Sequence, residues 1–125
     1  MTREIFDHKG TSPASSELSI VADGDVGKGG ECSRYIITLQ PENPASTPYV
    51  TIHFQNGPIK EAGVNGVTEQ ALIAIVIDRL RSFQSGPFAC REDALALTKL
   101  EEGMHWLAER TRDRERRGVE GTYKK

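Results

Sequence analysis

Apolar and polar positions alternate in the first half of the chain and recur every three or four residues in the second half. Residues 34–40 (RYIITLQ) and 49–56 (YVTIHFQN) are rich in β-branched and aromatic side chains, which is typical of strands. In the later segment Val50, Ile52 and Phe54 alternate with polar residues, so one face of that strand is apolar. The short, proline-containing loop between the two segments predicts an antiparallel hairpin.

The chain on either side of this hairpin carries weaker signals. Residues 1–33 are polar and broken by Gly, Ser and Asp, so we expect an extended or loosely ordered segment with one short strand at 18–23. After the hairpin, Asn-Gly pairs at 56–57 and 65–66 are turn signals, and a third strand is expected between them.

The hydrophobic period changes to that of a helix after residue 67. Thr68 is a suitable N-cap, so a first helix is expected over about 68–84, before the Ser-Gly-Pro sequence at 85–87 ends it. A second helix is expected over about 88–117, where Gly118 supplies the stop. At ~1.5 Å per residue this helix is about 45 Å long.

These elements predict an α+β fold. Apolar residues spaced by three or four along the second helix are typical of an antiparallel helix pair: Leu97, Leu100, Met104 and Leu107. We therefore expect a small N-terminal antiparallel sheet within residues 1–66 and a long C-terminal helical hairpin with a final turn within residues 67–125.

One segment predicts that the protein is oligomeric. Residues 71–77 (ALIAIVI) are seven consecutive apolar residues within the first helix, so that helix is apolar on every side. A helix of this kind is normally buried all round. One partner helix and a small sheet cover about two of its faces, and the remainder favours self-association.

Composition excludes several classes of protein. The chain has 125 residues and a net charge of −2, which lacks the positive excess expected of a duplex nucleic-acid binder. It has no apolar run of the ~20 residues that span a bilayer and no hydrophobic signal segment at its start, so we expect a cytoplasmic protein without a membrane partner. Its two cysteines, Cys32 and Cys90, are expected to be reduced and partly buried.

Catalytic and metal-binding patterns are missing from the sequence. His8, His53 and His105 share no metal-ligand spacing with one another or with the cysteines, and His53 is expected at the surface. No nucleophile elbow surrounds the serines, and residues 23–30 (DGDVGKGG) match neither a Walker loop nor an EF-hand. We therefore expect no catalytic residues, no metal and no cofactor.

The strongest chemical signal is a cluster of five arginines within residues 110–117. On a helix Arg110, Arg114 and Arg117 fall on one face, while Arg112 and Arg116 form a second row. Two interpretations stay open. Cations at a helix C-terminus complement the helix dipole, and arginine, with its planar fork of donors, is also the residue best suited to phosphate.

Three segments together resemble the phage anti-Thoeris and anti-CBASS sponge proteins: TPYVTIHFQNGPIKEAGVNGVT, FQSGPFACREDALALTKLEE and ERTRDRERRGVEGT. Those proteins share a C-terminal helical hairpin, and the resemblance covers about residues 33–122. The strands ahead of the hairpin favour the anti-Thoeris branch. The resemblance implies a non-enzymatic phage protein of the host cytoplasm that holds cyclic nucleotide immune messengers without cleaving them. The implied ligands are cyclic ADP-ribose isomers such as glycocyclic ADP-ribose and, in a second pocket, cyclic di- and trinucleotides. The implied assembly is a dimer or a hexamer.

The resemblance also implies ligand-binding residues. Phe83 would stack on the ligand, Asp93 would hold it from the start of the second helix, and Arg110 and Arg114 would bind it from the other end. Further candidates for phosphate contacts, or for the second pocket, are Arg91, Arg116, Arg117, Gly121 and Thr122. The last two belong to a small turn whose backbone N–H groups can approach a phosphate closely.

Asp93 departs from the family, where this position is commonly asparagine. A carboxylate only accepts hydrogen bonds, so Asp93 suits a ribose hydroxyl or an adenine amino group and repels a phosphate. Asp93 and Arg110 are seventeen residues apart on one expected helix, which is about 25 Å. If both contact one small ligand, they come from different subunits. Two other functions remain as alternatives: a helical-hairpin adaptor whose arginines meet an acidic protein, and an enzyme that hydrolyses the messenger.

Overall fold

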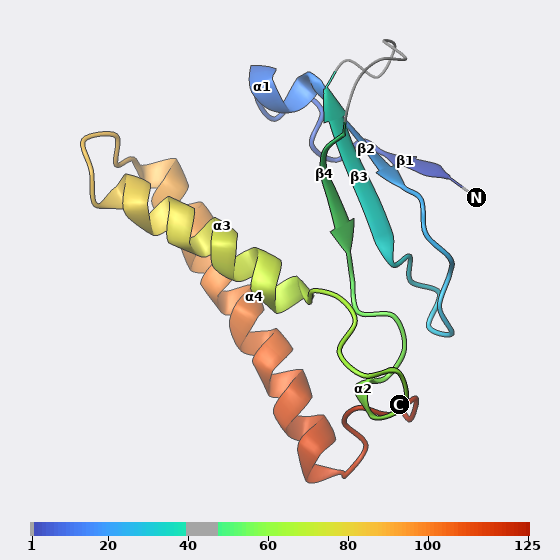
Figure 1. The fold of residues 1–125 in the computed structure, drawn as a ribbon. Helices are drawn as coiled ribbons and strands as arrows, with labels where there is room; N and C mark the ends of the chain where they lie inside the picture. The colour runs from blue at the N-terminus through green and yellow to red at the C-terminus, as the bar shows by residue number, and fades with distance from the viewer. Residues whose placement is uncertain (1, 40–47) are drawn as a thin grey trace. The chain divides into compact units, whose positions relative to one another are not determined.

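The computed structural model describes residues 2–39 and 48–125, and it confirms an α+β fold (Figure 1). The described residues form four strands, two short helices and two long helices. In order they are β1 (Arg3–Ile5), α1 (Pro13–Ser16), β2 (Leu18–Ala22), β3 (Arg34–Leu39), β4 (Pro48–His53), α2 (Ile59–Ala62), α3 (Glu69–Gln84) and α4 (Arg91–Arg116). The chain divides into two compact units, one of Met1–Gly57 with Val64–Gly66 and one of Pro58–Gly63 with Val67–Lys125.

The first unit is built on one antiparallel sheet with the strand order β1-β2-β3-β4. The strands expected at 18–23, 34–40 and 49–56 are confirmed as β2, β3 and β4. Strand β1, which pairs with β2, was not anticipated because it has only three residues. The loop expected at 41–47 lies outside the described residues.

The segment between β2 and β3 is more regular than expected. The Gly27 N–H donates to the Glu31 carbonyl at 2.8 Å, and Val26 pairs with Cys32 across a tight turn. A Cβ at Gly27 would meet the Glu31 carboxylate at 2.3 Å, a contact that this flexible side chain can relieve by moving. At Gly30 the positive φ of 89° favours glycine directly. The run of glycines therefore closes a β-hairpin.

The third strand expected between the two Asn-Gly pairs is wrong, because this segment contains helix α2. The Asn56 N–H donates to Asn65 Oδ1 at 2.8 Å, and Asn65 Nδ2 donates to the Asn56 carbonyl at 2.7 Å. The Asn65 side chain therefore satisfies the backbone groups that a further strand would have paired. Gly63, with φ at 72°, then ends α2.

The helical hairpin of the second unit confirms the expected caps. The Ala71 N–H donates to the Thr68 hydroxyl at 3.1 Å, and Gly118 has a positive φ of 72° just after α4. At the tip, Gln84 Nε2 donates to the Cys90 carbonyl at 3.1 Å and Gln84 Oε1 accepts from the Cys90 N–H at 3.0 Å. The Gln84 side chain therefore bridges the turn between α3 and α4 through two hydrogen bonds to the backbone of Cys90.

The hairpin buries little apolar surface by itself. Ile77 is the one apolar residue of α3 that is buried, and among the described residues of α4 none is. Within the apolar run 71–77, Ile75 and Val76 remain 66% and 46% exposed in the single chain. Much of this helix therefore lacks the cover that its composition predicts.

Two smaller expectations have different outcomes. Cys32 is half-buried as expected, whereas Cys90 is exposed, so its expected burial is wrong. His53 is exposed, as expected from its place in β4. Across the described part of the chain, no helix has the length and apolar character needed to cross a membrane.

Candidate functional site

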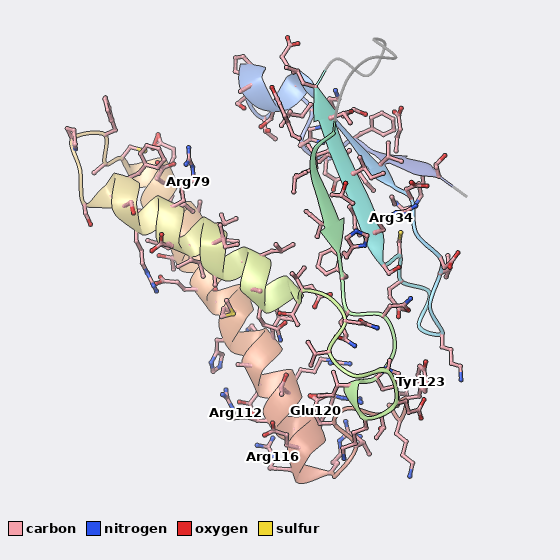
Figure 2. The ribbon with its side chains drawn as sticks, viewed as in Figure 1. Arg34, Arg79, Arg112, Arg116, Glu120 and Tyr123 are labelled. Carbon is pink, nitrogen blue, oxygen red and sulfur yellow. The ribbon has the colours of Figure 1, made fainter. Side chains whose placement is uncertain are left out.

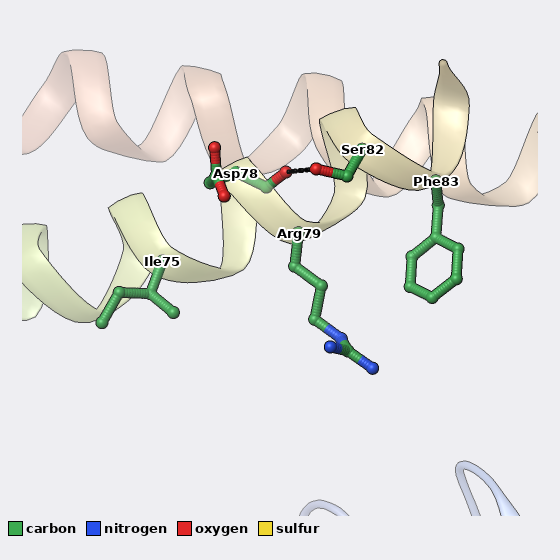
Figure 3. A pocket seen from close by; sticks show the side chains of 5 residues that line it. All are labelled: Ile75, Asp78, Arg79, Ser82 and Phe83. Carbon is green, nitrogen blue, oxygen red and sulfur yellow. Dashed lines mark hydrogen bonds between the residues drawn. The ribbon is translucent and has the colours of Figure 1, made fainter. Parts of the chain in front are cut away.

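An open cavity of about 500 Å³ lies along α3 (Figure 3). Its lining residues are spaced four apart along the helix, so they form two adjacent rows on one side. One row is Ile75, Arg79 and Phe83, and the other is Asp78 and Ser82. The Ser82 hydroxyl donates to the backbone carbonyl of Asp78 at 3.0 Å, so this bond does not use the Asp78 carboxylate.

Phe83, the expected stacking residue, presents its ring in this cavity and is 39% exposed. The Arg79 guanidinium carbon lies 5.3 Å from the centre of that ring, which is a cation–π distance. Sequence reasoning missed Arg79. The available signal was its spacing of four residues from Phe83, which places both side chains on one helix face.

Asp93 lies in the first turn of α4, where its negative charge complements the helix dipole. Asp93 is half-buried, and its carboxylate has no hydrogen-bond partner among the described residues. The hydrogen bonds between Gln84 and Cys90 hold the end of α3 to the start of α4. Phe83 and Asp93 therefore lie on the two helices that meet at the hairpin tip. Asp93 does not line the α3 cavity, and the exposed Arg91 lies beside it at the start of α4.

Arg112 and Arg116, near the end of α4 (Figure 2), and the following Arg117 are neutralised by carboxylates of this helix. Arg112 pairs with Glu109 at 2.9 Å, and Arg116 pairs with Glu109 at 3.4 Å and more distantly with Asp113. Arg117 donates to Asp113 at 3.0 Å. Hydrogen bonds from Arg112 and then Arg116 hold the pKa of Glu109 below its usual value. These arginines offer less free charge than their number suggests.

Arg110 differs from these neighbours. Arg110 is exposed, and its guanidinium has no hydrogen-bond or ion-pair partner in the described part of the chain. Its guanidinium is therefore the member of the cluster that is open to an external anion. The shared helix face of Arg110, Arg114 and Arg117 did not predict this, since the three residues have three different environments.

Arg114, the second arginine expected to bind ligand, is buried and holds the C-terminal turn instead. It is 7% exposed. Its Nε donates to Glu120 at 3.3 Å, and its two NH groups donate to backbone carbonyls of Val119, Thr122 and Lys124 at 2.7–3.1 Å. These four bonds use four of the five N–H groups of a guanidinium. Its geometry favours a positioning role over direct contact.

The expected phosphate donors of the final turn are also engaged. The Gly121 N–H donates to Glu120 at 3.1 Å, and the Thr122 N–H donates to the Val119 carbonyl at 3.2 Å. The Gly121 carbonyl accepts from the Lys60 N–H of α2 at 3.2 Å, so the turn packs against the short helix of its own unit. In this conformation neither N–H points to a free ligand site.

The two ends of the candidate site are far apart within one chain. Helix α4 is continuous from Arg91 to Arg116, which separates Asp93 from Arg110 by about 25 Å. The structure therefore does not bring Phe83 and Asp93 together with Arg110 in a single chain.

A second, smaller cavity of about 180 Å³ lies in the first unit. Arg34 and Asp23 pair there at 3.0 Å, and His53 lines the same space. Burial raises the pKa of the nearby Cys32 thiol, but hydrogen bonds with the backbone of Arg34 and Gly24 outweigh it, so the net pKa is below the usual value. Among the described residues, no group of three or more His, Cys, Asp or Glu side chains is placed to hold a metal.

Comparison with known proteins identifies the family of the helical hairpin. The family model of the Acb2/Tad1 hairpin domain matches residues 47–112, which include β4, α3 and most of α4. Thoeris anti-defense 1 of Bacillus phage SBSphiJ7 is 57% identical over 75 residues, covering 60% of this chain and 53% of that protein. The chain thus spans about half the length of the curated relative. The match confirms the resemblance found in the sequence, and the chain belongs to the Acb2/Tad1 hairpin-domain family.

Proposed function

We propose that this protein binds and sequesters the cyclic nucleotide messenger of Thoeris immunity, glycocyclic ADP-ribose, without cleaving it. The observation that carries the proposal is the half-exposed Phe83 ring in a cavity of about 500 Å³ on the hairpin of this family. The name of the relative, Thoeris anti-defense 1, supports the same function. The protein would act in the host cytoplasm during phage infection.

The ligand chemistry follows from Phe83 near the end of α3 and from Asp93 and Arg110 toward the two ends of α4. The Phe83 ring offers an apolar face on which an adenine base can stack. The Asp93 carboxylate accepts from a ribose hydroxyl or an adenine amino group. The exposed Arg110 guanidinium, which lacks an acidic partner among the described residues, pairs with a phosphate.

We infer that each ligand is held between two copies of the chain. A compact cyclic nucleotide cannot bridge the ~25 Å from Asp93 to Arg110 on one helix, so Arg110 comes from a neighbouring subunit. The exposed apolar side chains of the hairpin, among them Ile75, Val76 and Trp106, supply surface for such contacts. Both a dimer and a hexamer satisfy this arrangement.

A second pocket for cyclic di- or trinucleotides is part of the same proposal. The side chains of Arg91, Arg116 and Arg117 are exposed and lie at the ends of α4. Gly121 and Thr122 would contribute if the final turn rearranged, because their N–H groups are now bonded within the chain. Arg114 acts here as the residue that shapes the turn.

The adaptor function is less well supported. An acidic protein partner would have to compete with the carboxylates that already pair with Arg112, Arg116 and Arg117. Within the described residues, the cluster offers Arg110 as its open cation, which suits a compact ligand better than an extended acidic surface.

One experiment separates the functions. The purified protein is incubated with glycocyclic ADP-ribose, freed of unbound nucleotide by gel filtration, and denatured by heat. Mass spectrometry of the released material should find the intact messenger. Recovery of a cleaved nucleotide would indicate an enzyme, and the absence of any nucleotide would contradict the binding proposal and favour the adaptor.

A further inference from the structure

We propose that Arg79 selects for phosphate in the α3 cavity by supplying the positive charge beside the Phe83 ring. This inference rests on the proposed function, since it concerns how the same pocket recognises the phosphates of its ligand. It adds a cation on α3 to the Arg110 guanidinium, which approaches from the neighbouring subunit.

The geometry places Arg79 and Phe83 as one recognition unit. They lie one helical turn apart on α3, and both side chains project to the same side of the helix (Figure 3). The guanidinium carbon lies 5.3 Å from the ring centre. A base that stacks on this ring therefore has a planar cation within reach of whatever group is attached to it.

The charge of Arg79 is open to the ligand. Nearby on the same helix, Arg81 pairs with Glu101 of α4 at 2.8 Å. Arg79 has no hydrogen-bond or ion-pair partner in the part of the chain that the structure describes, and its ring contact with Phe83 restrains it without neutralising it. An arginine held in this way loses little freedom when it binds a phosphate.

Asp78, the one carboxylate among the described residues that line the cavity, sets the orientation of the ligand. Asp78 lines the space together with Arg79 and would repel a phosphate placed beside it. A nucleotide stacked on Phe83 is therefore expected to turn its phosphates toward Arg79 and its hydroxyl or amino groups toward Asp78. A nucleoside without phosphate gains nothing from the cation, so the pocket discriminates against it.

The test compares three variants by titration calorimetry with glycocyclic ADP-ribose. Arg79→Gln keeps a polar side chain but removes the guanidinium and its charge, and should weaken binding about 10- to 100-fold, the loss expected for a hydrogen bond to a charged group. Arg79→Lys keeps the charge without the planar fork and should recover part of the affinity. Arg81→Gln is the matched control, because it removes the same charge from the same helix outside the cavity, and should bind like the wild type.

Gel filtration and thermal melting of each variant ensure that only folded, normally assembled protein is compared. Wild-type affinity in Arg79→Gln, with binding lost in Arg110→Ala, would overturn the role of Arg79 and leave the proposed function intact. Equal loss in Arg79→Gln and Arg81→Gln would show a diffuse charge effect and would also overturn it. Failure of the wild-type protein to bind the messenger would overturn the proposed function itself.

Discussion

Arg114 donates from its Nε to the carboxylate of Glu120 at 3.3 Å, and its two NH groups bond to three carbonyls of the chain that follows. A buried guanidinium thus fastens the C-terminal turn to the end of α4. Breaking such a group leaves several polar atoms without partners, which costs more than the loss of an exposed ion pair.

Replacing Arg114 by alanine should therefore destabilise the protein. We expect a loss of about 2 kcal/mol in the free energy of unfolding, measured by urea denaturation, with faster hydrogen exchange at Val119 and Thr122. Arg112→Ala is the control, since it removes an exposed ion pair and should cost less than about 1 kcal/mol. Equal stability of the two variants would contradict the positioning role of Arg114.

Replacing Arg110 by alanine should weaken messenger binding and leave the fold unchanged. The expected loss in affinity is about 10- to 100-fold, because one charge-assisted hydrogen bond to phosphate disappears. Arg112→Ala serves again as the control, since Arg112 is already paired with Glu109. Titration calorimetry measures both, and normal binding by Arg110→Ala would remove this residue from the site.

Mixing two defective variants tests whether the site lies between subunits. Phe83→Ala and Arg110→Ala should each bind the messenger poorly when pure. If one site takes Phe83 from one chain and Arg110 from another, refolding an equal mixture restores about a quarter of the sites, by random pairing. No recovery in the mixed oligomer would contradict a shared site. The baseline is Phe83→Ala refolded alone under the same conditions.

The carboxyl group of Glu109 should titrate below its ordinary pKa of 4.5, because hydrogen bonds from Arg112 and Arg116 favour its ionised form. A pKa lowered by folding means that the stabilisation is complete above the unfolded pKa and disappears as the pH falls through the folded pKa. Carbon NMR of the Glu109 carboxyl should show this shift, and the pKa should rise toward the ordinary value in Arg112→Ala. An unshifted Glu109 in the wild type would show that these ion pairs do not persist in solution.

Two glycines should respond in opposite ways to alanine. At Gly66 an added methyl group would meet the Phe54 carbonyl carbon at 2.4 Å, so Gly66→Ala should destabilise the loop after β4 and lower the melting temperature. At Gly103, within α4, an added methyl group meets nothing within 4 Å, and Gly103→Ala should stabilise the helix by about 0.5–1 kcal/mol. A melting temperature of Gly66→Ala at or above the wild-type value would contradict the close approach seen here.

Local signals in the sequence were sufficient for most of the fold. Runs of β-branched residues predict β3 and β4, and Thr68 and Gly118 mark the start of α3 and the end of α4, because caps and turns act over a few residues. The same local rules led to a strand where α2 lies. They could not show that the Asn65 side chain would bond across the loop to Asn56.

The candidate site depended more on tertiary structure. The sequence and its family resemblance identified Phe83, Asp93 and Arg110, and helix spacing alone separated the last two by about 25 Å. Only the folded chain distinguished the arginines, because the path after Gly118 buries Arg114 and leaves Arg110 open. Only the cavity revealed Arg79. The sequence determines which groups are present and how they repeat along a helix, whereas their charge and exposure depend on what the rest of the chain brings next to them.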